Sequence, residues 1–405
     1  MRDSHNRDLC RALIDCSQSG DLAGVVHLLS QGANPCYKAS NALRVAAEAG
    51  HAECVKALLP VSAPKDNNSA LRLAASNGHA ECVALLARSS DPKANRSIAL
   101  SMAAANGHAD CAKLLIPLSY PKARASQALR QATENGHAEC VRLLIPVSDP
   151  KARDSEALVL AARQGFAECV RLLIPVSDPK DDESSALRWA AFHGHAECIK
   201  LLILVSEPKA RYSSALHYAS MNGHAECVKL LIPVSDPKAR DYEALASAAR
   251  HGHAECVKLL IPVSDPKSDN SETLASAARY GRAECVKLLL PVSDPKHNHR
   301  ALQMAIDYAS AECVKLLLPA SGPLLKRKKI RTSALSWGNV DILLLMLSFE
   351  PLLLTGLDLP SYRDASTAKG HVEMAALLSS IIEQQDLVDT LPQPTPGGGP
   401  TARRL

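Results

Sequence analysis

Apolar and polar positions alternate along this chain in a repeating pattern that predicts pairs of short helices. One copy begins at Ser155 and reads SEALVLAARQGFAECVRLLIPVSDPKDDE. Leu158, Ala161 and Ala162 stand at helical spacing, so the first half of the copy predicts a helix with one apolar face. Ser155 is expected to cap the start of this helix, and Gly165 to end it where the backbone needs a positive φ.

The second half of the copy predicts another helix, from about 167 to 174. Pro175 is expected to end this helix, because a proline ring clashes with the preceding turn. The following Ser-Asp-Pro-Lys segment predicts a turn that leads into the next copy. The apolar side chains expected to point inward are Cys169, Val170, Leu172 and Leu173.

This pattern returns at a nearly constant interval, which the cysteine of the second helix marks. Intervals between successive cysteines are 28 residues, then 29 seven times, then 28. A turn glycine, replaced once by Ala309, marks thirteen repeats between Gly20 and Gly370. A fixed period of this size predicts a solenoid, in which each repeat buries its apolar face only against its neighbours. The ten cysteines are Cys54, Cys82, Cys111, Cys140, Cys169, Cys198, Cys227, Cys256, Cys285 and Cys313.

One of these repeats resembles the ankyrin repeat, whose pattern is Thr-Pro-Leu-His-x-Ala-Ala, Gly-His, Val-Val-x-x-Leu-Leu and Gly-Ala-Asp. It reads SSALHYAS, GH, CVKLL and SDP within residues 213–237. The resemblance covers roughly 9–382 and implies an all-α helical repeat solenoid. It also implies that first helices line a concave face that binds proteins. The chain departs from the family in its repeat, about four residues shorter than the usual 33, which predicts shortened fingers between repeats.

Composition changes toward the ends of the chain and suggests three regions. Residues 1–8 are expected to form an N-terminal extension, and 9–383 the repeat array. Within the array the repeats in 324–383 are degenerate and are expected to act as a cap that faces water. Residues 384–405 contain PQPTPGGGP and have the composition of a disordered tail.

Charge and hydropathy exclude several classes of partner. The 405 residues include 46 basic and 42 acidic side chains, a net charge of +4, which disfavours nucleic acid as the main partner. The most apolar stretch, 342–354, is interrupted by Glu350 and Pro351 and is shorter than a membrane span. The N-terminus lacks the apolar segment of a secretory signal. We therefore expect an intracellular, cytoplasmic and monomeric protein.

The cysteines are expected to be core residues without metal or disulfide chemistry. Stacked helices lie roughly 10 Å apart, whereas a disulfide needs Cα atoms within about 7 Å and zinc needs ligands at about 2 Å. Free thiols in such number are typical of a reducing compartment.

The candidate binding site consists of the residue pairs that precede the turn glycine, which in ankyrin repeats typically face the concave groove. Early pairs are small, polar or acidic, whereas in repeats 6–11 they become large or basic, as at interface hot spots. We expect Phe192, Met221, Tyr280 and Tyr308 as apolar anchors and the arginines as carboxylate partners. The alternative is that these exposed pairs vary because nothing constrains them. The predicted set is Arg163, Gln164, Phe192, His193, Met221, Arg250, His251, Arg279, Tyr280 and Tyr308.

Other side chains are interpreted as structural. Trp189 and Tyr218 occupy a position that is often large and semi-buried in ankyrin repeats. The recurring Gly-His histidine has two interpretations: a ladder for metal binding or pH sensing, or the family's usual role of holding the turn through hydrogen bonds. Phe166 and Arg282 replace it in two repeats, which favours the structural role.

A basic run follows the repeat of Ala309. It resembles a nuclear-localisation signal or a patch for anionic surfaces, and the alternative is an ordinary solvated loop. Nuclear as well as cytoplasmic location is therefore considered. The residues are Lys326, Arg327, Lys328, Lys329 and Arg331.

The sequence predicts a non-enzyme that needs no cofactor. No phosphate loop, His-Glu-x-x-His or Cys-x-x-Cys motif is present, and no separate segment is long enough for a catalytic domain. We expect a scaffold that binds a protein through the concave face of repeats 6–11. Two alternatives stay open: an effector secreted by a host-associated organism into a host cell, and an activity carried by the degenerate C-terminal region.

Overall fold

The computed structural model describes residues 2–62, 67–267, 271–294 and 298–390. The described residues form twenty-six α-helices and no strand, arranged as thirteen consecutive pairs. This confirms the all-α repeat solenoid and its shortened fingers. In the sixth repeat, for example, α12 ends at Leu173 and the next first helix begins at Asp181, with only a turn between them.

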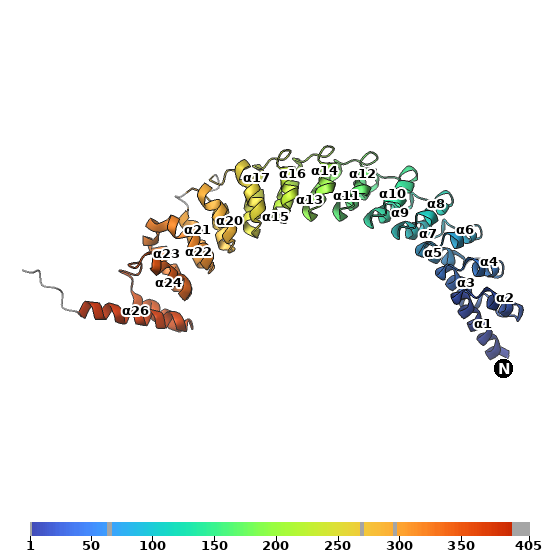
Figure 1. The fold of residues 1–405 in the computed structure, drawn as a ribbon, viewed down its shortest axis with the longest axis horizontal. Helices are drawn as coiled ribbons and strands as arrows, with labels where there is room; N and C mark the ends of the chain where they lie inside the picture. Colours follow the sequence, from blue (N-terminus) through green and yellow to red (C-terminus); the bar gives the residue numbers. More distant parts are fainter. Residues whose placement is uncertain (1, 63–66, 268–270, 295–297, 391–405) are drawn as a thin grey trace, which may run out of the picture. The chain divides into compact units, whose positions relative to one another are not determined.

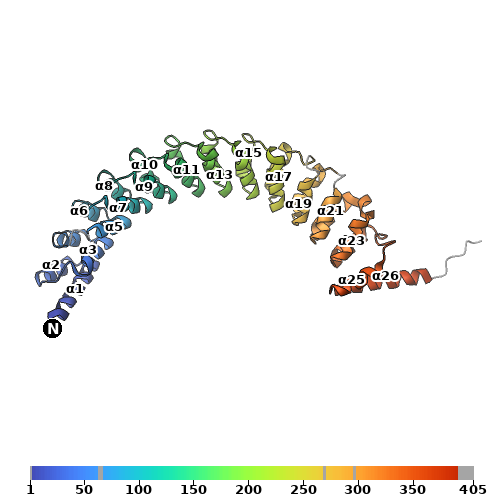
Figure 2. The same ribbon diagram turned by 180° about the vertical axis from the view of Figure 1, so that it is seen from behind.

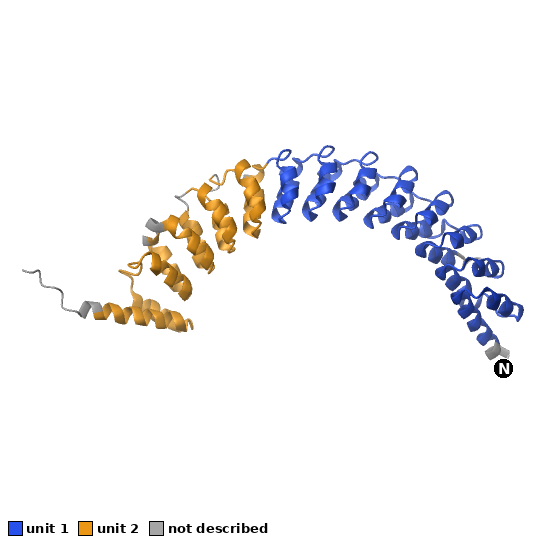
Figure 3. Ribbon diagram, viewed as in Figure 1, with its two compact units in different colours: residues 1–236 blue, residues 237–405 orange. Residues whose placement is uncertain are grey.

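The chain divides into two compact units, residues 1–236 (unit 1) and 237–405 (unit 2), each described here by itself (Figure 3). Within each unit, first helices pack side by side in one layer and second helices in another (Figures 1 and 2).

Unit 1 holds eight helix pairs. They are α1 (Arg2–Ser19), α2 (Leu22–Ser30), α3 (Tyr37–Ala49), α4 (Ala52–Leu58), α5 (Asn67–Asn77), α6 (Ala80–Leu86), α7 (Ala94–Ala105), α8 (Ala109–Leu115), α9 (Ala123–Glu134), α10 (Ala138–Leu144), α11 (Ala152–Gln164), α12 (Ala167–Leu173), α13 (Asp181–His193), α14 (Ala196–Leu202), α15 (Ala210–Met221) and α16 (Ala225–Leu231).

Unit 2 holds five pairs. They are α17 (Ala239–His251), α18 (Ala254–Leu260), α19 (Glu272–Arg279), α20 (Ala283–Leu289), α21 (Asn298–Asp307), α22 (Ala311–Leu317), α23 (Lys328–Ser336), α24 (Val340–Phe349), α25 (Leu359–Ala368) and α26 (Val372–Thr390).

Each repeat buries the apolar faces of both its helices. In the seventh repeat Leu187 and Ala190 of α13 and Cys198 and Leu202 of α14 are fully buried. The ten periodic cysteines are all free and buried, which confirms their role as core residues. Burial raises the pKa of the Cys198 thiol from 9.0 to about 11, so this thiol is protonated and unreactive at neutral pH.

The turn glycine couples neighbouring repeats as well as ending the first helix. Gly165 has φ +82°, and a Cβ there would lie 2.5 Å from Nδ1 of His195 in the next repeat. The same imidazole donates through Nε2 to the carbonyl of Arg163, 3.0 Å away. The recurring histidine therefore joins two repeats. Arg282 replaces this contact by donating from Nε to the carbonyl of Arg250.

Ser155 does not cap a helix, contrary to the sequence prediction. α11 begins at Ala152, and the buried Ser155 lies in the left-handed region with φ +56°. Its Oγ accepts a hydrogen bond from the Asp178 amide, 2.9 Å away, and donates to Oδ2 of Asp181, 2.6 Å away. The hydroxyl thus fixes the turn that starts the next repeat. The same serine–amide bond recurs at Ser126, Ser184 and Ser213.

The expected boundaries of the array fall inside helices. Residues 2–8 form the first turns of α1, and α26 continues through the expected start of the tail to Thr390. The rest of the tail, 391–405, lies outside the described residues.

Candidate functional site

The predicted site residues of unit 1 lie at the ends of three consecutive first helices. Arg163 and Gln164 are exposed at the end of α11, and His193 is exposed at the end of α13. Phe192 on α13 and Met221 on α15 are half-buried. All five residues thus lie at the C-terminal ends of first helices. Their part in binding stays a prediction.

Phe192 is the centre of an aromatic cluster that spans two repeats. Its ring lies edge-on to Trp189 at 5.8 Å, to His193 at 5.0 Å and to Tyr218 of α15 at 5.7 Å between centroids. Trp189 is 38% exposed and Tyr218 is half-buried. The interpretation of Trp189 and Tyr218 as mainly structural missed that both also face solvent beside Phe192.

Two cationic or titratable side chains border this cluster. The guanidinium of Arg163 lies over the Trp189 ring at 5.2 Å, a cation–π contact between repeats. The imidazole of His193 stacks on that of His195, with 6.0 Å between the ring centroids. Burial, followed by the charges of His195 and Arg163, lowers the pKa of His193, so its imidazole is neutral at physiological pH.

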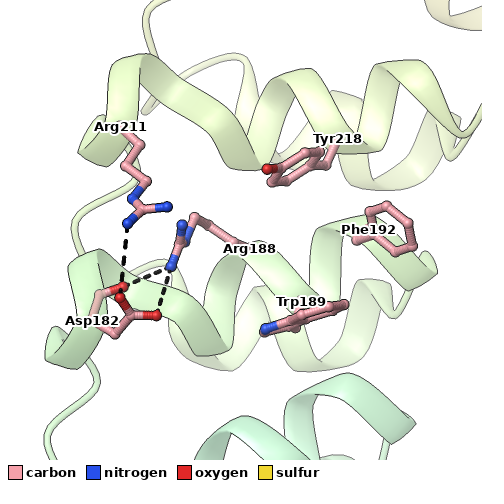
Figure 4. A pocket seen from close by; sticks show the side chains of 6 residues that line it. All are labelled: Asp182, Arg188, Trp189, Phe192, Arg211 and Tyr218. Atoms are coloured by element: carbon pink, nitrogen blue, oxygen red, sulfur yellow. Dashed lines mark hydrogen bonds and ion pairs between the residues drawn. The ribbon is translucent and has the colours of Figure 1, made fainter. Parts of the chain in front are cut away.

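A pocket of about 320 Å³ opens between α13 and α15 (Figure 4). Trp189, Phe192 and Tyr218 line one side. Asp182, Arg188 and Arg211 line the other.

The polar side of this pocket is a network of compensating charges. Arg188, with only 10% of its side chain exposed, donates from Nη2 to the carbonyl of Asp182 at 2.8 Å and to its Oδ2 at 3.0 Å. Arg211 pairs with Glu183, and its Nη2 lies 4.0 Å from Oδ1 of Asp182. Two guanidinium groups thus face two carboxylates. The sequence analysis did not select these residues, because Arg211 meets Asp182 and Glu183 only when α15 packs beside α13.

The predicted residues of unit 2 form a separate aromatic and basic group. Arg250 and His251 end α17, and Nδ1 of His251 donates a hydrogen bond to the Ser247 carbonyl, 2.9 Å away. The Arg279 guanidinium lies between two rings, 5.5 Å from the centroid of Tyr280 and 4.6 Å from that of Tyr308. Both tyrosines are about half exposed.

Trp337 extends this group and was not among the predicted residues. It occupies the position before Gly338 that Tyr308 occupies before Ala309, and it is 60% exposed. Its indole Nε1 donates to Oδ1 of Asp307 at 3.2 Å. Extending the comparison of pre-glycine pairs to one more repeat would have found it.

The basic run is largely helical and its members diverge. α23 includes Lys328, Lys329 and Arg331, and Arg331 donates from Nη1 to the carbonyls of Leu353 and Thr355. Arg327 and Lys329 line a second pocket, with His299 and Arg300 of α21. The side chain of Lys326 lies outside the described residues. A function for the run in localisation stays a prediction.

Within the described ranges, no group of three or more His, Cys, Asp or Glu side chains is placed to hold a metal ion. None of the helices in that part of the chain has the length and apolarity needed to cross a bilayer.

A two-layer stack of paired helices with a turn glycine and a shared face on the first helices defines a helical repeat protein. The sequence model of ankyrin repeats (3 copies) matches residues 13–97, 88–154, 129–212, 204–270 and 247–329. The chain therefore belongs to the ankyrin-repeat family. No curated protein sequence matches it.

Proposed function

We propose that this chain is a non-catalytic scaffold that binds a protein partner through its first-helix face, with the pocket between α13 and α15 as an anchor site. Ankyrin repeats generally mediate protein–protein interaction, and proteins of the family are typically non-catalytic.

The observation that carries the proposal is the aromatic wall of the α13–α15 pocket. Trp189, Phe192 and Tyr218 meet there although aromatic residues make up only 3% of the chain. Tryptophan, tyrosine and arginine dominate the binding energy of interfaces, and they act most strongly in pockets that exclude water. This pocket therefore fits a bulky side chain of a partner.

The charge network decides which kind of side chain fits best. Because Arg188 and Arg211 face Asp182 and Glu183, the polar side of the pocket is close to neutral. A charged side chain would lose its hydration without gaining an unpaired counter-charge. An apolar or aromatic side chain gains the contacts with the wall at no such cost, and it is the expected occupant.

Unit 2 is proposed to contribute through its own first-helix ends. Tyr280 and Tyr308 would supply apolar contact area, as would Met221 in unit 1. Arg250 and Arg279 would pair with partner carboxylates, although Arg279 is already engaged with two rings. The monomeric state, the effector alternative and an activity of the C-terminal region stay predictions from the sequence.

The test is affinity capture with mass spectrometry on a Trp189→Ala/Phe192→Ala double variant. A matched control is Leu118→Ala/Leu204→Ala, which removes two exposed apolar side chains of unit 1 outside the pocket. We expect the aromatic variant to lose its partner by about tenfold or more, and the control to keep it. An unchanged partner set, with helical content intact by circular dichroism, would overturn the proposal.

A further inference from the structure

A second pocket, of about 350 Å³, lies between α21 and α23 in unit 2. His299 and Arg300 line it from α21, and Arg327 and Lys329 from the start of α23. Met304 and Ile330 provide its apolar part. No acidic side chain is among the residues that line it.

The positive charge of this pocket is only partly compensated. Nη2 of Arg300 lies 2.6 Å from Oε2 of Glu272, and both side chains are half exposed. Within the described residues, neither Arg327 nor Lys329 has a carboxylate within ion-pair distance, and both are exposed. Cations that line one pocket repel one another, and a bound anion would relieve that repulsion.

We propose that this pocket binds the phosphate group of a phosphorylated serine or threonine in a protein segment. A phosphate monoester carries nearly two negative charges and three acceptor oxygens, so it can engage cations from both helices at once. A single carboxylate carries one charge and two oxygens, and would leave part of the cluster unsatisfied.

The surroundings favour a protein segment as the carrier of the phosphate. Gln303 lines the pocket and donates to Ser333 at 2.5 Å and to Asp307 at 2.8 Å, and Asp307 accepts from Trp337. These hydrogen bonds connect Gln303, which lines the pocket, to the exposed Trp337 that directly follows α23. The carboxylates of Glu272 and Asp307 border it and would repel a continuous anionic surface, such as a membrane or a nucleic-acid backbone. This inference rests on the proposed function in that it assumes a protein partner, but it concerns a different site.

The experiment measures binding of the full chain to a degenerate peptide library with a central phosphoserine, against the same library with serine. Inorganic pyrophosphate and vesicles of phosphatidylcholine with phosphatidylserine are measured in parallel. The test variant is Arg327→Gln/Lys329→Gln. Its control is Lys258→Gln/Lys287→Gln, which makes the same change of charge on exposed second-helix positions of unit 2.

We expect the full chain to retain the phosphoserine library at least about tenfold better than the serine library. The test variant should lose this preference and the control should keep it. No preference for phosphoserine, or a preference that survives in the test variant, would overturn the inference. Binding to pyrophosphate or vesicles without any peptide preference would also overturn it. Because Trp189 and Phe192 are untouched, capture of the partner by unit 1 is scored separately from this result.

Discussion

The gap between α13 and α15 and the gap between α21 and α23 occupy equivalent positions in two repeats. The side chains that line them differ in both charge and aromatic content. Counting back from the turn residues Gly194 and Ala309, Arg188 corresponds to Gln303 and Trp189 to Met304. The first gap has an aromatic wall and balanced charges. The second has an aliphatic wall and a surplus of positive charge.

This difference shows how a repeat array keeps one core while the side chains in its gaps vary. The second helices and the buried alanine and leucine positions of the first helices are nearly the same in both repeats, because they meet the same neighbours. The side chains that line the gaps are not part of this shared core. They can therefore differ from repeat to repeat on one backbone.

The largest expected effect concerns the buried core behind both gaps, which contains the periodic cysteine of each second helix. Burial raises the pKa of Cys198 in unit 1 and of Cys285 in unit 2 from 9.0 to about 11. Between these pH values the unfolded chain loses thiol protons that the folded chain retains, so the free energy of unfolding falls as pH rises. Urea unfolding at pH 7.5 and pH 10, with local probes in each unit, should show this loss in both.

A pair of cysteine variants controls for other groups that titrate at high pH. Cys198→Ala should reduce the alkaline loss, whereas Cys36→Ala, at an exposed cysteine, should leave it unchanged. If only one unit loses stability at pH 10, the two units do not share the same core and the comparison fails.

A smaller effect is expected from the position that differs most between the gaps. Arg188→Met removes two hydrogen bonds of a guanidinium that is largely buried, and we expect the free energy of unfolding to fall by about 1–3 kcal/mol. Arg211→Met breaks a more exposed pair, which solvent screens, and should change the free energy of unfolding much less. Both variants are compared by urea unfolding. If they lose the same free energy of unfolding, the two arginines contribute equally to the network and the buried Arg188 is not its main stabilising member.

The smallest effect concerns Ala309, where the second gap lacks the turn glycine. Ala309 has φ +55°, which an L side chain rarely adopts. Ala309→Gly relieves this strain, which raises the free energy of unfolding. Glycine also makes the unfolded chain more flexible, which offsets part of that gain. The net gain in stability should be about 0.5–1 kcal/mol. Thermal unfolding checks this. A decrease would mean that the alanine methyl group makes contacts that outweigh the strain.

The sequence predicted the architecture well because its signals are local. The period, the turn glycines and the helix-stopping prolines each act within a few residues, and all thirteen helix pairs appear where they were expected. The prediction for Ser155 was wrong because its hydroxyl bonds to the amide of Asp178, 23 residues further along the chain, a contact that local capping rules do not include.

The candidate site was predicted in part for the same reason. The pre-glycine pairs located Phe192 and Tyr308, whose positions follow from their own helix. Asp182, Arg188 and Arg211 were not predicted because none is unusual alone, and Arg211 reaches the carboxylates of α13 only because α15 packs beside that helix. Such pairings could be found by comparing the middle of each first helix with the start of the next.

The bond from the turn histidine to the preceding repeat has a consequence for cooperativity. In repeats 11 and 12 the histidine is replaced by Ser310 and Asn339, and among the described residues neither side chain donates a hydrogen bond to the preceding repeat. In a stack that is held together only by nearest neighbours, two missing ties in succession divide one melting transition into two. We therefore expect amide hydrogen exchange to show α21–α26 opening as a block before the rest of unit 2. The end of the chain would then open and close on its own while the remaining repeats stay folded.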